Sequence, residues 1–395
     1  MTKPKVLFVD DEPRILDGLR RSLRGKRTEW DMSFAPGGEP ALELLATAKH
    51  DVIVSDMRMP GMDGAELLTR VSIQYPEVAR VVLSGHTEPE AAIRVAIAGH
   101  RFLTKPTETE TLTGVIDQLI VKTSGTHGSE ARHIAGTARA LPTLPGQIAE
   151  LGAALAAQDS DPARLPQAVS LDTGLTAKVL QLSNSAFFGA RPKNAGIAAV
   201  VTAMGVPTIQ ALVSATAELW SPTTWEPETE AFLRLTLRHA VATASLVESV
   251  ASPAHRPHAH AAALLQDVGG LAALAGLVGG SPHSVDLGLG RCEGMPFRDV
   301  GVELLHLWGL PAPVTAAVAE RDLPHEPAEA GLGVSGAVRV AHLLIQGIEA
   351  GDPSIGMHDD ELKVLLAHPQ MATRSCDWDA AAEDAWERAG KWPAA

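Results

Sequence analysis

Cysteine is scarce in this sequence, because only Cys292 and Cys376 occur among 395 residues and they lie far apart. This spacing suits neither a disulfide framework nor a set of metal ligands, so we expect a protein of a reducing compartment. Aromatic residues make up only 4% of the chain, whereas 35 glycines and 27 prolines are present. The composition favours helices that pack through small side chains, and GC-rich coding would produce the same bias.

The sequence also lacks excess positive charge and long apolar runs. Its formal net charge of −14 disfavours a nucleic-acid partner, since binding to phosphates needs a basic surface. No run approaches the roughly 18 apolar residues of a membrane span, and no apolar signal region precedes the first strand at Lys5. Hydrophobic residues are 45% and charged residues 20% of the chain, as in globular proteins. We therefore expect a cytoplasmic protein with two or three domains and no membrane partner.

Short apolar runs alternate with helical patterns over residues 1–122. The central run is Val52–Ser55, which ends at Asp56 and leads into a turn-forming stretch with Pro60 and Gly61. Five such runs alternate with five helical patterns, which predicts an α/β doubly wound parallel sheet. The predicted strands lie near residues 5–9, 31–35, 52–55, 80–83 and 101–103.

Polar residues follow four of the five predicted strands: Asp10, Asp11, Asp56, Ser84 and Lys105. The carboxyl ends of parallel strands share one edge, where ligands bind in open α/β sheets. Three carboxylates there repel one another unless a cation lies among them, and Mg²⁺ suits such oxygen ligands. One carboxylate could then accept a phosphoryl group, with Ser84 and Lys105 stabilising its oxygens. The alternative, that these residues are unrelated and Asp56 only caps a turn, is disfavoured by the match at every one of these strand ends.

Four motifs carry these residues, and through them residues 1–122 resemble the receiver domain of bacterial response regulators. The motifs are VLFVDDEP (6–13), SDMRMPGMDG (55–64), VVLSG (81–85) and FLTKP (102–106). The resemblance implies that Asp56 is the phospho-acceptor for a sensor histidine kinase. It also implies Mg²⁺ held by Asp11, Asp56 and the backbone carbonyl of Arg58, with Asp10 acting through a water.

The same resemblance implies the residues that respond to phosphorylation. Ser84 takes the position of the switch hydroxyl and Lys105 that of the lysine that faces the phosphate. Phe102 takes the position of the aromatic rotamer switch, which is often tyrosine in the family. The Lys105–Pro106 bond is expected to be cis, against a base rate of roughly 5% for X–Pro bonds. His86 is expected to lie in a solvated loop near the site.

The rest of the chain divides into a linker, a helical region and a tail. Small polar residues predict a flexible linker over 123–136, although residues 130–136 could begin the next helix. Residues 137–350 repeat apolar side chains at helical spacing and predict an all-α domain. Residues 351–395 predict an acidic, helical tail, which is either a solvated face or a segment docked through its tryptophans, namely Trp378, Trp386 and Trp392.

Five stretches of the helical region resemble the HDOD family, a helical output domain related to HD-type metal phosphohydrolases. They are LPTLPGQIAEL (141–151), LDTGLTAKVLQLSNSAFFG (171–189), AVVTAMGVPTIQALV (199–213), HAAALLQDVGGLAAL (260–274) and ELLHLWGLPAPVTAAV (303–318). An HD-type metal site needs an adjacent His and Asp, and Gln266 and Asp267 stand at that position. Glutamine is a poor ligand for a transition metal compared with imidazole.

The remaining histidines leave two interpretations open. His239 could supply an earlier ligand, but a helix-surface or hydrogen-bonded core histidine is the simpler account. The cluster His255, His258 and His260 could bind a metal, but it reads more simply as a solvated loop. His306 falls at a helical position near Trp308 and reads as packing. We therefore expect no cofactor in the HDOD domain and no enzymatic activity beyond phosphorylation and dephosphorylation of the receiver itself.

Two functions are consistent with these observations. The first is a phosphorylation-dependent switch, in which the face of the fourth helix, fifth strand and fifth helix changes, forms a homodimer or presses on the HDOD domain. That domain would then bind or release an unknown downstream signalling protein. The second is a phosphorylation-gated, metal-dependent phosphohydrolase. A DNA-binding regulator is disfavoured, because the charge is negative and no basic recognition helix is found.

Overall fold

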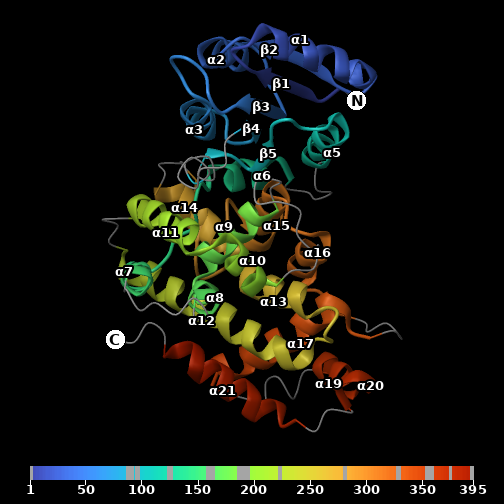
Figure 1. Ribbon diagram of the computed structural model, residues 1–395. Helices are drawn as coiled ribbons and strands as arrows, with labels where there is room; N and C mark the ends of the chain where they lie inside the picture. The colour runs from blue at the N-terminus through green and yellow to red at the C-terminus, as the bar shows by residue number, and fades with distance from the viewer. Residues whose placement is uncertain are drawn as a thin grey trace.

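The computed structural model describes residues 3–85, 93, 98–121, 128–156, 165–184, 196–220, 225–278, 283–325, 331–351, 360–372 and 376–391. Over these ranges an N-terminal α/β domain lies on one end of a larger helical body (Figure 1). Some predictions fall outside the described residues, namely those on His86, most of the fourth helix of the first domain, residues 122–127, residues 185–189 and Trp392.

A five-stranded parallel sheet forms the centre of the N-terminal domain, with the strand order β2-β1-β3-β4-β5. All five residues of β3 are buried, which explains why this strand reads as a continuous apolar run rather than an alternating one. The predicted doubly wound sheet is confirmed. The strands are β1 (Lys5–Val9), β2 (Asp31–Ala35), β3 (Val52–Asp56), β4 (Ala79–Ser84) and β5 (Arg101–Thr104).

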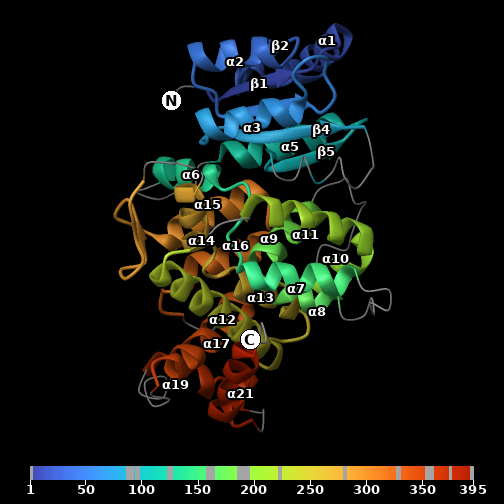
Figure 2. The same cartoon turned by 90° about the vertical axis from the view of Figure 1, so that its left-hand side faces the viewer.

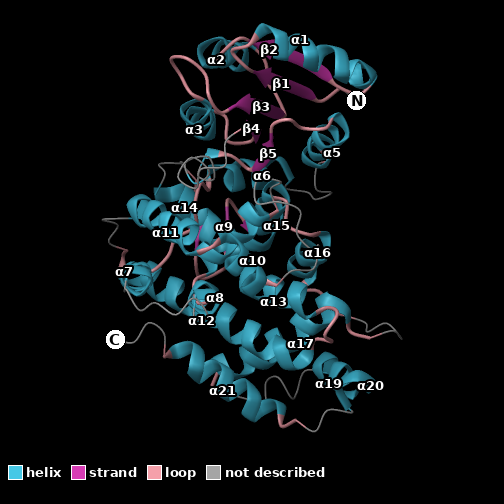
Figure 3. Cartoon of the chain, in the orientation of Figure 1, coloured by secondary structure: helices cyan, strands magenta, loops and turns pink. Residues whose placement is uncertain are grey.

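Helices cover both faces of this sheet, with α2 and α3 on one side and α5 on the other (Figure 3). The side chain of Asp63 caps α3 by accepting a hydrogen bond of 2.8 Å from the Glu66 amide. An ion pair of 2.9 Å between Lys26 and Asp117 ties η1 to α5. The elements are α1 (Pro13–Ser22), the 3₁₀ helix η1 (Leu23–Thr28), α2 (Gly38–Thr47), α3 (Gly64–Gln74) and α5 (Thr109–Ile120).

The second domain is helical, as predicted, apart from one small sheet. Its helices are α6 (Gly128–Thr137), α7 (Pro145–Ala156), α8 (Leu165–Ser170), α9 (Thr173–Ser183), α10 (Ile197–Met204), α11 (Val206–Trp220), α12 (Pro227–Val250), α13 (Arg256–Leu265), α14 (Val268–Val278), α15 (Phe297–Trp308), α16 (Ala312–Glu320), α17 (Gly333–Glu349), α19 (Asp360–Ala367), α20 (Pro369–Ala372) and α21 (Trp378–Gly390). The sheet, which the sequence did not predict, consists of β6 (Val285–Asp286), β7 (Arg291–Cys292) and β8 (Met295–Pro296). Strands of two residues are too short to show an alternating pattern.

Helix α6 occupies most of the range expected to be a linker. Its residues Ala131 and Ile134 are buried, and the helix packs against α14 and α15. In Figures 1 and 2, α6 and α15 both lie directly beneath the N-terminal domain. The expected flexible segment over 123–136 therefore contains a packed helix from residue 128 onward.

One apolar stretch corrects the expectation that nothing resembles a membrane span. Within the described ranges, Arg256–Val278 is the single helical stretch long and apolar enough to cross a membrane, and 83% of its 18-residue apolar window is buried inside the fold. The pair Ile197–Met204 and Val206–Thr216 passes the same test only if its bend of 100° is treated as one span. The burial of Arg256–Val278 identifies it as a core segment of the helical domain.

The tail helix α21 docks on the helical domain instead of presenting only a solvated face. Arg238 of α12 donates hydrogen bonds of 3.1 and 3.0 Å to the Trp386 carbonyl, and its guanidinium lies 3.9 Å from the centre of the Trp386 ring. The ring also meets His239 edge to face at 6.5 Å. The sequence left the role of the tail open, and the contacts of Trp386 assign α21 to the fold.

Candidate functional site

Asp56 lies at the carboxyl end of β3, where the residue is buried and its side chain is 11% exposed. Its Oδ2 atom accepts a hydrogen bond of 2.8 Å from the Arg58 amide. Helix α3 begins directly against the strand end, because a Cβ atom on Gly64 would overlap the Asp56 carbonyl oxygen. Only glycine therefore permits this close approach, which fixes the backbone around Asp56.

Lys105 joins two carboxylates at this edge of the sheet. Its Nζ atom lies 2.7 Å from Oδ2 of Asp10 and 2.5 Å from Oδ1 of Asp56. Burial alone would lower the pKa of Lys105, but hydrogen bonds to Asp10 and Asp56 and their charges raise it overall. The ammonium group is therefore cationic at neutral pH and offsets the repulsion between the two carboxylates.

The two acidic residues after β1 have different surroundings. Asp10 is buried, and its Oδ1 atom accepts a hydrogen bond of 2.9 Å from the Glu12 amide. Asp11 is half-buried, and its side chain has no hydrogen bond or ion pair with any residue that the structure describes. No group of three or more His, Cys, Asp or Glu side chains is arranged as a metal site within the described ranges. Lys105 holds the cationic position between Asp10 and Asp56 instead.

The other predicted site residues lie on the neighbouring strands. Ser84 is buried at the end of β4, and its carbonyl accepts a hydrogen bond of 2.9 Å from the Lys105 amide. Phe102 is buried on β5, and a Cβ atom on Gly99 would lie 3.0 Å from its ring. The Lys105–Pro106 bond is cis, as the receiver resemblance implies.

A contact with the helical domain begins on β5, one of the elements whose face was expected to form a homodimer or press on the HDOD domain. Arg101 donates hydrogen bonds of 3.0 Å to the Leu307 carbonyl and 2.9 Å to the His306 carbonyl, at the end of α15. His306 donates in return from Nε2 to the Gln118 carbonyl of α5 at 2.7 Å. His306 thus makes a specific contact between the domains in addition to packing.

Further contacts extend this interface toward β4. Gln181 of α9 donates to the carbonyls of Gly99 and His100 at 3.0 and 3.2 Å. Arg80 of β4 donates to the Gly136 carbonyl at 2.9 Å, and Arg132 of α6 donates to the Glu77 carbonyl at 3.0 Å. In the sequence, the contact at β4 was indicated only by a charged residue, Arg80, at the start of an otherwise apolar strand.

Three basic side chains are fully buried at this interface. Burial, followed by the nearby charges of Arg139 and Arg132, lowers the pKa of Arg80 to about 9. Burial also holds the pKa of Lys178 and of His100 well below their usual ranges. Lys178 donates to Gln181 Oε1 at 2.8 Å and lies 4.5 Å from the centre of the Trp308 ring. His100 is therefore neutral at physiological pH, with four basic residues, Arg80, Arg132, Lys178 and Arg101, near it.

The residues expected at an HD-type metal site form other interactions. His239 is buried, donates from Nδ1 to the Glu349 carboxylate at 2.6 Å, and its Nε2 atom lies 3.1 Å from Nδ1 of His342. Asp267 forms an ion pair with Arg321, a residue that the sequence did not single out as its partner. Among the described residues, no hydrogen bond or ion pair joins His239 to Asp267. His239 is thus the hydrogen-bonded core histidine that the simpler account predicted.

The histidine cluster lies on a helix rather than in the expected loop. His258 and His260 are in the first two turns of α13, and His255 precedes the helix. His260 pairs with Glu248 at 2.8 Å, and His255 contacts the Ser252 hydroxyl at 3.2 Å. His255 and His260 therefore bind different partners.

Two family models match the chain. The response regulator receiver domain matches residues 6–117, and the HDOD domain matches residues 141–279. Together they cover the sheet domain and the helices from α7 to α14.

The similar curated proteins each match about a third of this chain. The transcriptional regulatory protein YesN of Bacillus subtilis is 31% identical over 139 residues, which are 33% of this chain and 36% of that protein. The hydrogenase transcriptional regulatory protein HoxA of Cupriavidus necator is 37% identical over 29% of this chain and 24% of its own length. The chain therefore spans only about a quarter to a third of these two relatives.

Similar solved structures cover a comparable share of the chain. The signal receiver domain of an HD domain-containing protein from Pseudomonas fluorescens is 30% identical over 30% of this chain and 88% of its own, with a TM-score of 0.29. The chemotaxis response regulator CheY4 of Vibrio cholerae is 31% identical over 30% of this chain and all of its own, with a TM-score of 0.28. With the two family matches, the chain combines the receiver domain of response regulators, at residues 6–117, with an HDOD domain, at residues 141–279.

Proposed function

We propose that this protein is a phosphorylation-dependent signalling switch in which Asp56 accepts the phosphoryl group and the HDOD domain acts without catalysis. The observation that carries the proposal is the bridge of Lys105 between Asp10 and Asp56 at the carboxyl edge of the sheet. A carboxylate oxygen of Asp56 would attack the phosphorus of a phosphohistidine on a sensor kinase. The P–O bond forms as the P–N bond breaks, and the histidine nitrogen keeps the electron pair and takes up a proton.

The residues around Asp56 fit a hard cation. Asp11, which has no described partner, would supply an oxygen ligand together with Asp56 and the Arg58 carbonyl, and Asp10 would act through a water. When bound, Mg²⁺ neutralises charge on the transferring phosphoryl group. Lys105 and the Ser84 hydroxyl would bind the phosphoryl oxygens, so Lys105 would have to shift from its present contacts.

The route to the HDOD domain runs along two strands. Ser84 and Arg80 lie on β4, while Lys105 follows β5, which carries Arg101. Arg80 and Arg101 both donate to carbonyls of the helical body. Movement of Ser84 and Lys105 toward a phosphoryl group would therefore shift an equilibrium between a docked and a released HDOD domain, for which a few kcal/mol suffice.

The absence of catalysis in the HDOD domain is supported by Arg321. Its guanidinium pairs with Asp267 and Asp322, which leaves Asp267 neutralised without a metal. Burial would lower the pKa of Arg321, but the charges of Asp267 and Asp322 outweigh it and raise the pKa overall. A fixed cation at this position repels a metal ion, and Gln266 supplies no imidazole in its place.

The proposed partners are a sensor histidine kinase and a downstream signalling protein, with a homodimer as an additional state. The absence of nucleic-acid and membrane partners, and the cytoplasmic location, remain predictions. A pull-down with wild type and Asp56→Asn, each with and without a phosphodonor, tests the downstream partner. Identical partner sets in all four conditions would contradict the switch.

Hydrogen exchange tests the switch within the molecule itself. We expect beryllofluoride with Mg²⁺ to increase exchange at residues 99–101 and 306–309 in the wild type, because the contacts of Arg101 and Gln181 loosen. Asp56→Asn, which removes the nucleophilic oxygen at nearly constant volume, should show no change. Stoichiometric transition metal in the purified protein together with phosphodiester hydrolysis would instead establish the phosphohydrolase.

A further inference from the structure

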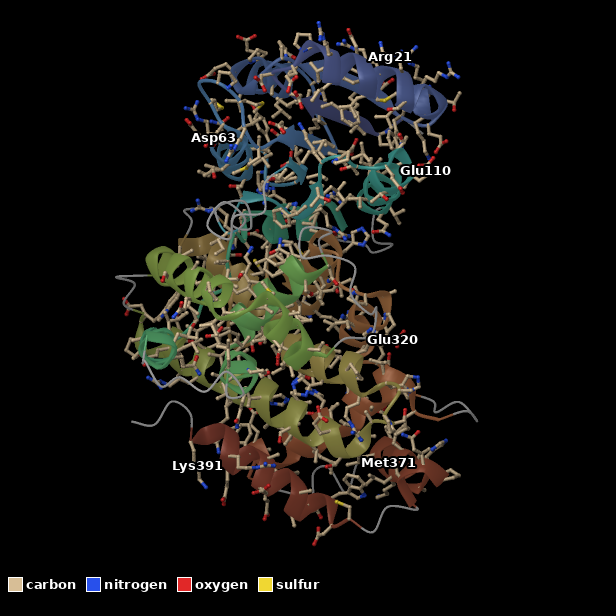
Figure 4. All side chains as sticks on the ribbon, viewed as in Figure 1. Arg21, Asp63, Glu110, Glu320, Met371 and Lys391 are labelled. Carbon is tan, nitrogen blue, oxygen red and sulfur yellow. The ribbon has the colours of Figure 1, made fainter. Side chains whose placement is uncertain are left out.

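His100 lies at the boundary between the receiver and the HDOD domain, immediately before β5. The residue is only 1% exposed, and its carbonyl accepts a hydrogen bond of 3.2 Å from Gln181 of α9. Side chains of both domains fill this boundary, which lies between Glu110 of the receiver and Glu320 of the helical body in Figure 4. The ring of His100 is therefore shielded from water while the two domains are docked.

Both nitrogens of the His100 ring face N–H donors of Arg80. Nδ1 accepts a hydrogen bond of 3.1 Å from the Arg80 amide, and Nε2 lies 2.7 Å from the Nη2 atom of the guanidinium. A neutral ring keeps a lone pair on one nitrogen and can accept from one of these donors. A protonated ring carries an N–H on both nitrogens, so each would meet another donor and neither would have an acceptor. This arrangement therefore favours a neutral ring.

The same arginine connects His100 to the HDOD domain. The Arg80 guanidinium donates to the Ala98 carbonyl within the receiver and to the Gly136 carbonyl of α6 across the boundary, each at 2.9 Å. A Cβ atom on Gly136 would overlap the Pro76 carbonyl oxygen, so α6 lies directly against the segment that precedes β4. Repulsion between a protonated His100 and Arg80 would therefore act on a contact between the domains.

Basic residues from four elements surround His100: Arg80 of β4, Arg101 of β5, Arg132 of α6 and Lys178 of α9. Burial, followed by these charges, holds the pKa of His100 well below its usual range. Burial lowers the pKa of Arg80 to about 9 and that of Arg101 to about 10, so both remain charged at neutral pH. In the part of the chain that the structure describes, no carboxylate pairs with the ring.

The carboxylates of this region act on Arg132 instead of on His100. Burial lowers the pKa of Arg132, and the charges of Glu303, Asp51 and Glu77 partly offset that effect. None of these three carboxylates is among the charges that shift the pKa of His100. A proton on His100 would therefore gain no nearby anion.

Two other histidines lie at the boundary, and both have acceptors that suit a protonated ring. His306 of α15 donates from Nε2 to the Gln118 carbonyl at 2.7 Å, and protonation leaves that N–H in place. His133 of α6 lies 3.3 Å from the Glu77 carboxylate, a contact that protonation turns into an ion pair. Burial also lowers the pKa of His306, so a variant of His306 has to be compared with a variant of His100.

We propose that acidification releases the HDOD domain from the receiver, because a proton on His100 removes its hydrogen bond with Arg80 and adds a charge among the basic residues of the boundary. In the released state, water solvates the ring, which then titrates near the ordinary histidine pKa of about 6.5. The released state therefore binds the proton first, and docking weakens about tenfold per pH unit below about pH 6.5. This response requires neither phosphorylation at Asp56 nor a metal.

Hydrogen exchange on the full-length chain between pH 7.5 and 5.5 tests the release. Protection factors, which correct for the pH dependence of exchange itself, should fall about tenfold per pH unit at residues 99–101 and 306–309 below about pH 6.5. The amides of β3 should remain better protected at every pH, because release does not unfold the receiver. Asp56→Asn should respond as the wild type does. Constant protection at residues 99–101 and 306–309, or protection of β3 no better than theirs, would overturn the proposal.

Variants assign the response to His100. His100→Gln retains a neutral acceptor for the Arg80 amide but cannot titrate, so the tenfold loss per pH unit should disappear. His50→Gln should respond as the wild type does, because it removes a buried histidine of the receiver that contacts the Ala48 carbonyl rather than the HDOD domain. His306→Gln should also keep the response. A response that persists in His100→Gln but is lost in His306→Gln would overturn the assignment.

Carbon-13 NMR of the histidine rings in the wild type tests the same assignment without a variant, should His100→Gln fail to fold. The ring of His100 should stay neutral while the domains are docked and should become protonated only as protection at residues 99–101 and 306–309 is lost. Protonation of His100 near pH 6.5 with that protection intact would contradict the proposal.

Discussion

At the scale of single residues, one cation, the ammonium group of Lys105, contacts two carboxylates. Asp10 is buried and Asp56 nearly so, and both contact the same ammonium group. Removal of the ammonium leaves the carboxylates facing each other without compensation. The receiver fold therefore depends on this charge for stability as well as for the proposed phosphoryl transfer.

This dependence predicts the behaviour of Lys105→Met in urea unfolding. The variant should lose about 1–3 kcal/mol of stability, the cost of leaving a buried polar group unpaired. Millimolar Mg²⁺ should recover more stability in the variant than in the wild type, because the ion then takes the place of the ammonium. Lys363→Met on α19, whose side chain is exposed, serves as the control. An equal effect of Mg²⁺ on the wild type and Lys105→Met would argue against the proposed ion site.

Buried neutral histidines predict how stability depends on pH. Burial and the charges of Arg80, Arg132, Lys178 and Arg101 hold the pKa of His100 well below 6.5 in the folded state. The unfolded chain therefore binds the extra proton first, and stability falls as the pH drops below about 6.5. The slope is about 1.4 kcal/mol per pH unit for each such group until the folded pKa is reached.

Urea unfolding between pH 7.5 and 5.5 measures this slope. His100→Gln should reduce it by about 1.4 kcal/mol per pH unit, because the titrating group is gone. His342, whose pKa burial and His239 hold low, should continue to contribute the same slope. His255→Gln, an exposed position, should leave the profile unchanged. An unaltered slope in His100→Gln would show that His100 is charged or solvated in the folded protein.

The sequence predicted some of these residues and missed others for a physical reason. Asp10, Asp56 and Lys105 each follow an apolar strand, so the parallel sheet brings them together without knowledge of side-chain packing. Gln266 could be recognised as a departure from a metal ligand, but its surroundings depend on helices distant in the chain. The partners of His239 lie 103 and 110 residues away, beyond the reach of local patterns.

At the scale of secondary-structure elements, α15 connects two regions of the molecule. Arg101 binds the carbonyls at its C-terminal end, and Phe297 and Arg298 at its N-terminal end line a pocket of the helical domain. Twelve helical residues span about 18 Å. The helix ends at Trp308, and Gly309 follows with a φ of 78°, a conformation that favours glycine, beside the Arg101 guanidinium.

The contact of Arg101 predicts a separable interface. Arg101→Ala should weaken the docking of the domains by about 1.5–3 kcal/mol, since a charged donor with two carbonyl partners is lost. We expect faster hydrogen exchange at residues 306–309 and an unchanged receiver core. Arg21→Ala, an exposed arginine of α1, is the control. Unaltered exchange at residues 306–309 would show that other contacts hold the domains together.

Elements were easier to predict than their contacts. The strands of the receiver followed from apolar runs that end in polar residues, and the helical character of the second domain followed from its periodicity. The start of α6 was left open, because residues 128–137 show a small-residue composition that suits a linker or a helix equally well. Packing against α14 and α15, which lie far along the chain, decides in favour of the helix.

At the scale of the whole molecule, the HDOD domain covers the edge of the receiver formed by β5 and α5. The proposed homodimer through this face therefore requires release of the HDOD domain first. Docking and dimerisation are then competing states of one surface, and phosphorylation would set the balance between them.

The cross-domain hydrogen bonds described above for Arg80, Arg101, Arg132, Gln181 and His306 all end on main-chain carbonyls. A carbonyl is present whatever the residue, so mutations at the acceptor positions can accumulate without compensating changes across the boundary. Evolution can thus diversify one surface while only the few donors are constrained. For protein engineering, a foreign receiver could be grafted onto this output domain if its backbone follows the same path and it retains arginines at the positions of Arg80 and Arg101.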